Sequence, residues 1–300
     1  MLIYITGLLV FAGLYALLAA GLNLQWGHTG LVNLGHVAFF AIGAYTTALL
    51  SRAGVPLWLT LLPAVVAAVV AAYPIGRLTL RLQEDYLAIV TFGFSEVLRQ
   101  ILSNERWTGA TNGLPGIPVL ASELGPIRHP ITAALVLALV AVVLVALRFL
   151  IESPYGRVLR AIRDDEDALR SVGKAPEGFR VTSLIVGSGI AGLAGWGYAH
   201  YVGFISPEQF APTLTFTIWT GVILGGSSLL GGTLGTLVFV MLLESTRFLS
   251  ALGLPIGASQ LAQVRLLVVG LSLIALMHAR PEGLMPYRHR QRLVRDGSTN

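Results

Sequence analysis

Residues 2–24 read LIYITGLLVFAGLYALLAAGLNL and carry no charged side chain. A helix of about 20 consecutive apolar residues spans the hydrocarbon core of a bilayer. The run has no basic start and is long enough to cross, so we expect a retained first helix rather than a cleaved signal peptide. This opening stretch predicts an integral membrane protein.

The composition of the whole chain agrees with that prediction. Of the 300 residues, 55% are hydrophobic and 12% are charged, and the mean hydropathy is +0.75. Soluble domains carry about 25% charged residues, so a soluble globular enzyme is excluded. The absence of cysteine excludes a disulfide framework, a thiolate metal site and a cysteine nucleophile. The net charge is +5, but the basic residues lie between apolar runs, so no nucleic-acid partner is expected.

Apolar runs recur along the chain and predict an all-α, polytopic transmembrane bundle of about eight to nine spans. Two runs are weak. Tyr86–Leu102 contains Glu96 and Arg99, and Leu214–Leu224 is short and ends in glycines. We therefore expect a broken or re-entrant element near Gly225–Gly232. The strong runs are Leu2–Leu24, Leu34–Leu50, Leu57–Gly76, Ile131–Ile151, Val181–Gly203, Thr233–Leu249 and Leu261–His278.

The basic residues predict the orientation of this single transmembrane domain, residues 1–300. They gather in the loop 152–180 and in the tail 280–300. Cytoplasmic loops carry an excess of Lys and Arg, so both segments are expected in the cytoplasm. Counting spans back from the central loop places residues 104–130 and the N-terminus outside. Counting forward places the tail inside.

Two apolar stretches are interrupted by glycine and polar residues: LNLQWGHTGLVNLGH at 22–36 and GVILGGSSLLGGTLG at 221–235. Paired interruptions of this kind point to a translocation site in transporters built from repeats. The alternative is that the glycines only permit close helix packing. Polar side chains at the break would satisfy freed backbone groups. The residues expected along the pathway are Asn33, His36, Thr91, Glu96, Trp219, Thr220, Gly225 and Gly226.

Glu96 and Arg99 are ionisable residues inside a predicted span, where each costs roughly 2.5–3.5 kcal/mol on insertion scales. Their spacing places them on one helix face. Two opposite charges that neutralise each other need no further role to account for them. We therefore favour a structural ion pair over a pair that lines the path of a zwitterionic substrate. His28 and His36 have too few further ligands nearby for a metal, so no metal site is expected.

The stretch SPYGRVLRAIRDDEDALRSVGKAPEGFR (153–180) is the longest charged segment between spans. Its pattern predicts a short amphipathic helix at the cytoplasmic surface, with Ala161, Ala168 and Leu169 near one side. A helix that lies on lipid would carry mainly Lys and Arg. The balance of acidic and basic residues here is more typical of a face that binds a protein partner.

Within this stretch, D167-A168-L169-x-x-x-G173 resembles the EAA-x3-G coupling motif of ABC importer permeases, with Asp for Glu and Leu for the second Ala. SPYGRVLRAIRDDEDALRSVG, GIAGLAGWGYAHYVGFISPEQF, GLNLQWGHTGLVNLGHVAFFAIGAYTTALL and ARPEGLMP are similar to blocks of the branched-chain amino acid permeases, the LivM-like subunits. DYLAIVTFGFSEVLRQILSNERWTGATNGLPGIP and GVILGGSSLLGGTLGTL are similar to two further blocks of the family. Taken along the chain, the blocks occur in the family's order and are spread over most of its length.

The resemblance implies a bacterial inner-membrane importer in which this chain forms half of the pathway. The implied partners are a homologous LivH-like permease, two LivG/LivF-like ATPases that bind ATP-Mg, a periplasmic or lipid-anchored binding protein, and membrane lipid. This chain contains no G-x-x-x-x-G-K-[ST] motif, so we expect a non-enzyme without a cofactor of its own. The implied ATPase-coupling residues are Gly156, Arg157, Arg160, Ala161, Asp165, Glu166, Asp167, Ala168, Leu169 and Gly173.

Several alternatives to this function stay open. The wider family also moves urea, short amides and aromatic amino acids. An ion-coupled carrier would transport without ATPases. A membrane-embedded enzyme would need a set of intramembrane catalytic groups, and neither H-E-x-x-H nor G-x-S-x-G occurs.

Overall fold

A computed structural model describes residues 2–79 and 84–245, together with isolated positions between 263 and 285. Apart from one short strand pairing, the described chain is helical, as predicted. The α-helices are α1 (Leu2–Thr29), α2 (His36–Arg52), α3 (Leu61–Thr79), α4 (Glu84–Asn104), α5 (Arg128–Glu152), α6 (Pro154–Asp164), α7 (Glu166–Ser171), α8 (Pro176–Val202), α9 (Pro212–Gly225) and α10 (Leu229–Ser245).

Four described segments are long and apolar enough to cross a membrane: Ile3–Thr29, Leu57–Leu78, Arg128–Glu152 and Pro176–Val202. They match four of the predicted spans within a few residues. The other apolar helices include α9 and α10, which are shorter. The predicted run Thr233–Leu249 lies partly outside the described residues. Most of Leu261–His278 and of the tail 280–300 also lies outside them.

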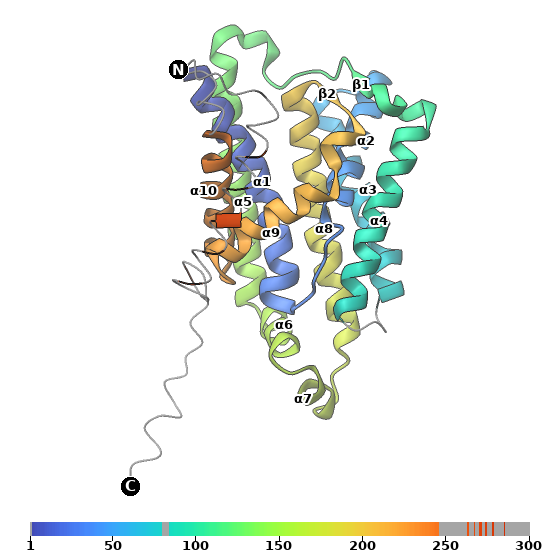
Figure 1. The fold of residues 1–300 in the computed structure, drawn as a ribbon, viewed down its shortest axis with the longest axis vertical. Coiled ribbons are helices and arrows are strands. Elements are labelled where there is room, and N and C mark those ends of the chain that lie inside the picture. The colour runs from blue at the N-terminus through green and yellow to red at the C-terminus, as the bar shows by residue number, and fades with distance from the viewer. Residues whose placement is uncertain are drawn as a thin grey trace.

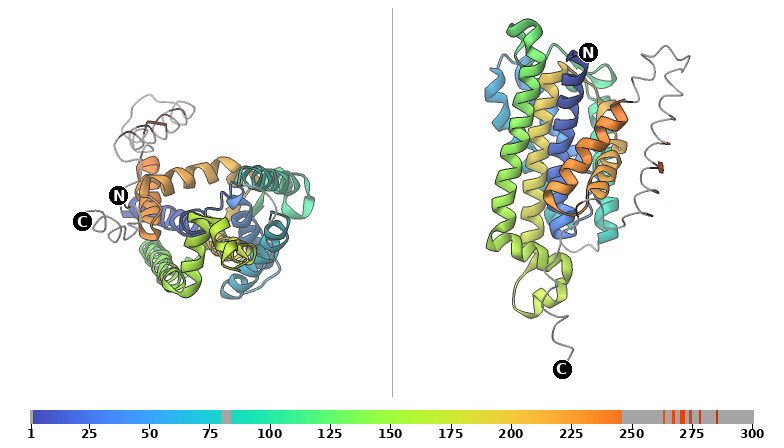
Figure 2. Two further views of the ribbon diagram at one scale, coloured as in Figure 1. Left: turned by 90° about the horizontal axis from the view of Figure 1, so that it is seen from below. Right: turned by 90° about the vertical axis from the view of Figure 1, so that its left-hand side faces the viewer.

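The long helices lie side by side, with α6 and α7 projecting at one end and the N-terminus at the other (Figure 1). A view along the bundle shows α3, α4, α5, α9 and α10 around α1, α2 and α8 (Figure 2). Most of α1 beyond Val10 is buried, because this helix is apolar on all sides and packs against α5, α8 and α10. In contrast, α3 and α5 each expose an apolar side, for example at Val70 and Val142.

The segment between α4 and α5 packs at the same end as the N-terminus (Figure 1). It contains η2 (Arg106–Thr108), η3 (Ala110–Asn112), β1 (Leu114–Pro115) and η4 (Ser122–Ile127). Strand β1 pairs antiparallel with β2 (Phe204–Ile205), which precedes η5 (Pro207–Phe210).

The buried His200 ring fixes this segment to the bundle. Its Nδ1 lies 2.7 Å from the Pro118 carbonyl oxygen, and its Nε2 lies 3.1 Å from Thr60 Oγ1, at the end of η1 (Leu57–Thr60). Trp196 Nε1 donates to the same hydroxyl at 3.1 Å. The segment 104–130 is therefore a packed part of the structure at this end.

Small residues let α2, α3 and α8 approach closely. A Cβ added at Gly43 would collide with the Gly192 backbone, and one at Gly195 would collide with the Phe40 carbonyl oxygen. Close backbone approach through small residues is a common source of helix association in membranes, where lipid supplies no hydrophobic driving force. Glycine packing therefore accounts for this contact.

We predict that Gly43→Ala destabilises the protein by about 1–3 kcal/mol, because its methyl group overpacks a backbone contact. Gly178→Ala is the matched control. Nothing lies within 4 Å of a Cβ at that position in α8, so the same change should raise stability by about 0.4–1 kcal/mol. Thermal unfolding of the purified chain in detergent measures both. Equal effects of the two variants would contradict the packing role.

Candidate functional site

The first predicted interruption is a true break between α1 and α2. Gly30 has φ +78°, and its N–H donates to the Trp26 carbonyl, while Leu31 N–H donates to the Gln25 carbonyl at 2.9 Å. The chain then turns back into the bundle before α2 starts (Figure 1). Helix α2 thus begins among buried residues, and the backbone groups of the break need partners within the protein.

Asn33 supplies part of that pairing, as predicted. Its Oδ1 accepts from the Gly35 N–H at 2.9 Å, and its Nδ2 donates to Gln25 Oε1 at 2.9 Å. Gln25 Nε2 in turn donates to the Leu184 carbonyl of α8 at 3.1 Å. All three polar side-chain contacts are inside the bundle, so the break is tied to both α1 and α8.

Two further helices complete the pairing. Trp219 Nε1 of α9 donates to the Asn33 carbonyl at 3.2 Å. Thr91 Oγ1 of α4 accepts from Leu34 N–H at 3.1 Å. Trp219 also packs edge-on against Trp26, with ring centroids 5.1 Å apart. The break between α1 and α2 is therefore held by α4 and α9, which lie far apart along the chain.

The second interruption is the turn from α9 to α10, which leaves the helical conformation at Gly226 (φ +96°). Gly225 packs directly on the Gly231 backbone, so the two helices form a close antiparallel pair. Asn23 of α1 donates to the Ser228 carbonyl at 3.2 Å and approaches the Gly226 carbonyl at 3.4 Å. Met285 N–H donates to the Gly225 carbonyl at 2.9 Å.

Three of the predicted pathway residues do not take part in this pairing. His36 is buried at the start of α2, and neither ring nitrogen has a hydrogen bond within the described part of the chain, although the ring lies near the Leu18 carbonyl. Thr220 Oγ1 donates within its own helix to the Phe216 carbonyl. Glu96 lies apart from the break.

Glu96 forms the expected pair with Arg99. Arg99 Nε donates to Glu96 Oε2 at 2.9 Å, and Nη2 donates to Oε1. Gln100 Nε2 adds a third bond to Oε1 at 3.0 Å. The Glu96 side chain is 37% exposed and the Arg99 side chain 25%, so the pair lies on an outward side of α4. The sequence alone could not show whether the pair faces the bundle or the outside.

The charged loop forms two helices rather than the single amphipathic helix that the sequence predicted. The chain is extended at Asp165, whose Oδ1 caps α7 by accepting from Ala168 N–H at 2.9 Å. Gly173, with φ +77°, ends α7: its N–H donates to the Arg170 carbonyl and the following N–H to the Leu169 carbonyl. The break at Asp165 turns Ala168 outward, so only Leu169 of α7 is buried.

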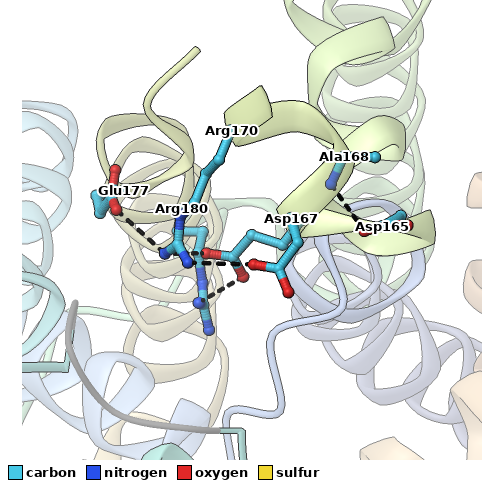
Figure 3. Close-up of polar contacts among 7 residues, drawn as sticks. Asp165, Asp167, Ala168, Arg170, Glu177 and Arg180 are labelled. Atoms are coloured by element: carbon cyan, nitrogen blue, oxygen red, sulfur yellow. Dashed lines mark hydrogen bonds and ion pairs between the residues drawn. The ribbon is translucent and has the colours of Figure 1, made fainter. Parts of the chain in front are cut away.

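The charges of this loop pair mainly with one another (Figure 3). Arg170 Nη2 lies 2.8 Å from Glu166 Oε1 and 3.2 Å from Glu177 Oε1. Arg180 Nη1 donates to Glu166 Oε2 at 3.1 Å, and Asp167 lies 3.5 Å from Arg170. The network joins α7 to the start of α8. We predicted from the sequence that these acidic and basic side chains form a partner-binding face. In the structure most of them instead form ion pairs with one another inside the loop.

Arginines attach α6 to the bundle. Arg160 Nη1 donates to the Ile151 carbonyl at 2.9 Å, and Arg163 Nη1 donates to the Gly27 carbonyl of α1. Gly156 is buried against the Ile151 backbone, which leaves no room for a side chain. Arg157 is exposed, and Ala161 is half-buried. Sequence reasoning missed Arg163, because the contact depends on where α1 ends.

These features define a class: a multi-pass helical membrane transport protein with two helix breaks joined inside the bundle and a helical segment projecting at one end. A family model described as "Branched-chain amino acid transport system / permease component" matches residues 4–277. The chain therefore belongs to this permease family.

Curated relatives agree with that assignment. The chain is 33% identical to the high-affinity branched-chain amino acid transport system permease protein LivM of Escherichia coli K12, over 95% of this chain and 71% of LivM. It is 26% identical to the probable LivM of Methanocaldococcus jannaschii, covering 94% and 93% of the two chains. It is 29% identical to the autoinducer 2 import system permease protein LsrC of Yersinia enterocolitica, covering 70% and 56%. No solved structure matches the chain.

Asn33→Ala should lower stability by about 1–3 kcal/mol for each buried group that it leaves unpaired, namely Gln25 Oε1 and the Gly35 N–H. Asn104→Ala is the matched control, because that exposed amide donates to the Gln100 carbonyl one turn earlier in the same helix. Its effect should stay within about 0.5 kcal/mol. Thermal unfolding in detergent compares the stability of the two variants. A loss for Asn33→Ala as small as that for Asn104→Ala would argue against the pairing.

Proposed function

We propose that the chain is the permease subunit of an ABC importer, in which it forms half of the pathway for branched-chain or related amino acids. The observation that carries this proposal is the projecting α6–α7 segment, whose D-A-L-x-x-x-G letters end at the helix-stopping Gly173. The names of the LivM relatives support the substrate class.

The proposed assembly has five protein subunits. A homologous LivH-like permease supplies the other half of the pathway. Two cytoplasmic LivG/LivF-like ATPases bind and hydrolyse ATP-Mg, and this chain contributes no cofactor or catalytic residue. A periplasmic or lipid-anchored binding protein delivers the substrate to the outer end.

In this proposal, residues 152–180 form the coupling loop, and the tip of α7 docks on an ATPase. Ala168 is exposed there, and Val172 is 70% exposed. The ion pairs of Arg170 with Glu177 and of Glu166 with Arg180 join α7 to the start of α8, which gives a displacement of α7 a direct contact to that helix. Asp165 caps α7, and Leu169 packs beneath it.

A displacement of the loop would reach the helix breaks through direct contacts. Arg163 holds the Gly27 carbonyl at the end of α1, and Gly27 packs against both Asn23 and the Ser227 backbone. Asn23 bonds the turn between α9 and α10. This chain of contacts supports a rigid-body switch, in which nucleotide-driven closure of the ATPases moves both breaks together.

The proposed pathway runs beside these breaks. Asn33, Thr91 and Trp219 hold the first break, while Gly225 and Gly226 form the second. His36 and Thr220 lie next to the first break on α2 and α9. Helix α2 begins there, and the positive end of its dipole favours a carboxylate nearby.

The proposed location is the bacterial inner membrane, with eight to nine spans, the N-terminus outside and the tail 280–300 in the cytoplasm. The N-terminus and residues 105–127 lie at one end of the bundle, and α6 and α7 at the other (Figure 1), which is consistent with this orientation. Because the chain has no cysteine, single-cysteine variants can test it.

Lys174→Cys, after α7, should react with a membrane-impermeant thiol reagent only when the cytoplasmic side is opened. Asn112→Cys, between α4 and α5, should react in intact cells. Both positions are exposed, so each thiol is accessible once the reagent reaches its side. The reverse pattern would invert the proposed orientation.

The function itself is tested by reconstituting this chain with its four partners in vesicles. ATP-dependent uptake of leucine, isoleucine or valine is the expected result, with little uptake of urea, short amides or aromatic amino acids. The purified chain alone should transport nothing. Uptake by the chain alone under an ion gradient would favour an ion-coupled carrier, and ATP-dependent uptake of another substrate would correct the substrate class.

Val172→Asp tests the coupling tip in the same vesicles. The side chain is exposed, so stability should change by no more than about 0.5 kcal/mol. A buried charge in the docked interface should reduce ATP-dependent uptake roughly tenfold or more. Asn104→Asp, exposed at the opposite end of the bundle, is the control. If the Val172→Asp transporter assembles and takes up substrate normally, the tip of α7 is not part of the interface with the ATPase.

A further inference from the structure

The outward side of α4 combines charged and apolar side chains. The Glu96–Arg99 pair, with Gln100 bonded to it, lies on the same helix as the exposed Ile89 and Val97. The exposed ion pair of α5, Arg148–Glu152, lies instead at the last residues of that helix. Glu96 is eight residues and Arg99 five residues before the end of α4 at Asn104, or about 12 Å and about 7 Å along the helix. In the proposed topology α4 is one of the spans, which places the pair in the membrane-spanning part of the helix.

A half-exposed ion pair at that depth is not suited to lipid. Charged groups within spans almost always face protein or a water-filled cavity, because lipid offers them no hydrogen bonds. The described part of this chain leaves the pair partly exposed, so the rest of its surroundings must come from outside it. Water in a pathway between two permeases would meet that need.

The neighbouring surface has the features of a site for a small amphipathic molecule. Phe92 of α4 and Phe216 of α9 lie side by side, with ring centroids 6.3 Å apart, and both are exposed. Gly93 leaves open space between Phe92 and the ion pair, because nothing lies within 4 Å of a Cβ built there. The Glu208 carboxylate in η5 is close enough to attract the Arg99 guanidinium electrostatically.

We propose that this face, formed by Phe92, Gly93, Glu96, Arg99 and Phe216, lines the translocation pathway and recognises an α-amino acid zwitterion. Arg99 binds the carboxylate of the substrate, Glu96 binds its ammonium group, and the two rings take an apolar side chain. The inference rests on the proposed function and adds to it the face and the residues that meet the substrate. It replaces our sequence-based preference for a purely structural ion pair.

Aqueous access is the first test, made on the assembled transporter in vesicles. Gly93→Cys fits without a clash and should react with a water-soluble thiol reagent roughly tenfold or more faster than Val142→Cys, because lipid suppresses the thiolate. Labelling is read on this chain alone, and saturating leucine with the binding protein should slow it at Gly93→Cys only. Equal, slow labelling at both positions would overturn the proposal and place the face against lipid or a dry subunit contact.

Recognition is tested by the neutral double variant Glu96→Gln/Arg99→Gln, which leaves no unpaired charge. It should assemble normally yet take up leucine at a rate lower by roughly tenfold or more, because charge-assisted hydrogen bonds to the substrate are lost. Arg148→Gln on α5 is the control for removing a span arginine and should transport normally. Normal uptake by the double variant would overturn the recognition role.

These outcomes are separable from failure of the proposed function. If the wild-type assembly takes up no amino acid with ATP, the proposed function is wrong. If the wild type transports and Gly93→Cys stays as unreactive as Val142→Cys, only the pathway face is wrong. The cysteine measurement also decides the matter when the double variant fails to assemble.

Discussion

The backbone groups freed at a helix break inside a bilayer must be paired by the protein, because hydrocarbon offers no hydrogen bonds. This constraint explains the arrangement around the start of α2. Asn33 pairs the Gly35 N–H, and Trp219 and Thr91 reach the break from α9 and α4. Asn33 belongs to the break itself, while the other two partners come from two further helices, so the break is fully paired only when α4 and α9 are packed against it. The most polar part of the interior is thus also the part that depends most on tertiary structure.

The same constraint links the break to the loop that projects from the bundle. Asn23 pairs the second break, and the turn of α1 that follows it carries Gly27, whose carbonyl accepts from Arg163 of α6. A carbonyl at the end of a helix has no partner in its own helix and is free to bind a cation there. One residue of the charged loop therefore contacts α1, the helix that also contacts both breaks, so the loop and the two breaks are joined through one helix.

Sequence predicts the parts of this fold that depend on composition. Residues 128–152 form a span because they are apolar, and Gly173 ends α7 because a positive φ suits glycine. The pairing of Glu96 with Arg99 followed from helix spacing alone. Sequence could not show that Arg163 reaches α1, because that contact joins segments distant along the chain and periodicity carries no information about which helices become neighbours. The division of the loop at Asp165 is local, and an Asp that can cap a new helix is the signal that the prediction of a single helix passed over.

The side chains on the outward sides of α3, α4 and α5 indicate what surrounds each helix in the membrane. Val142 and Val70 suit lipid because they are apolar and need no partner. An ion pair on the surface of α4 needs a polar environment, and its own partners leave it partly exposed. Its outward position therefore favours a surface that is completed only in the assembled transporter, since lipid offers the two charges no hydrogen bonds.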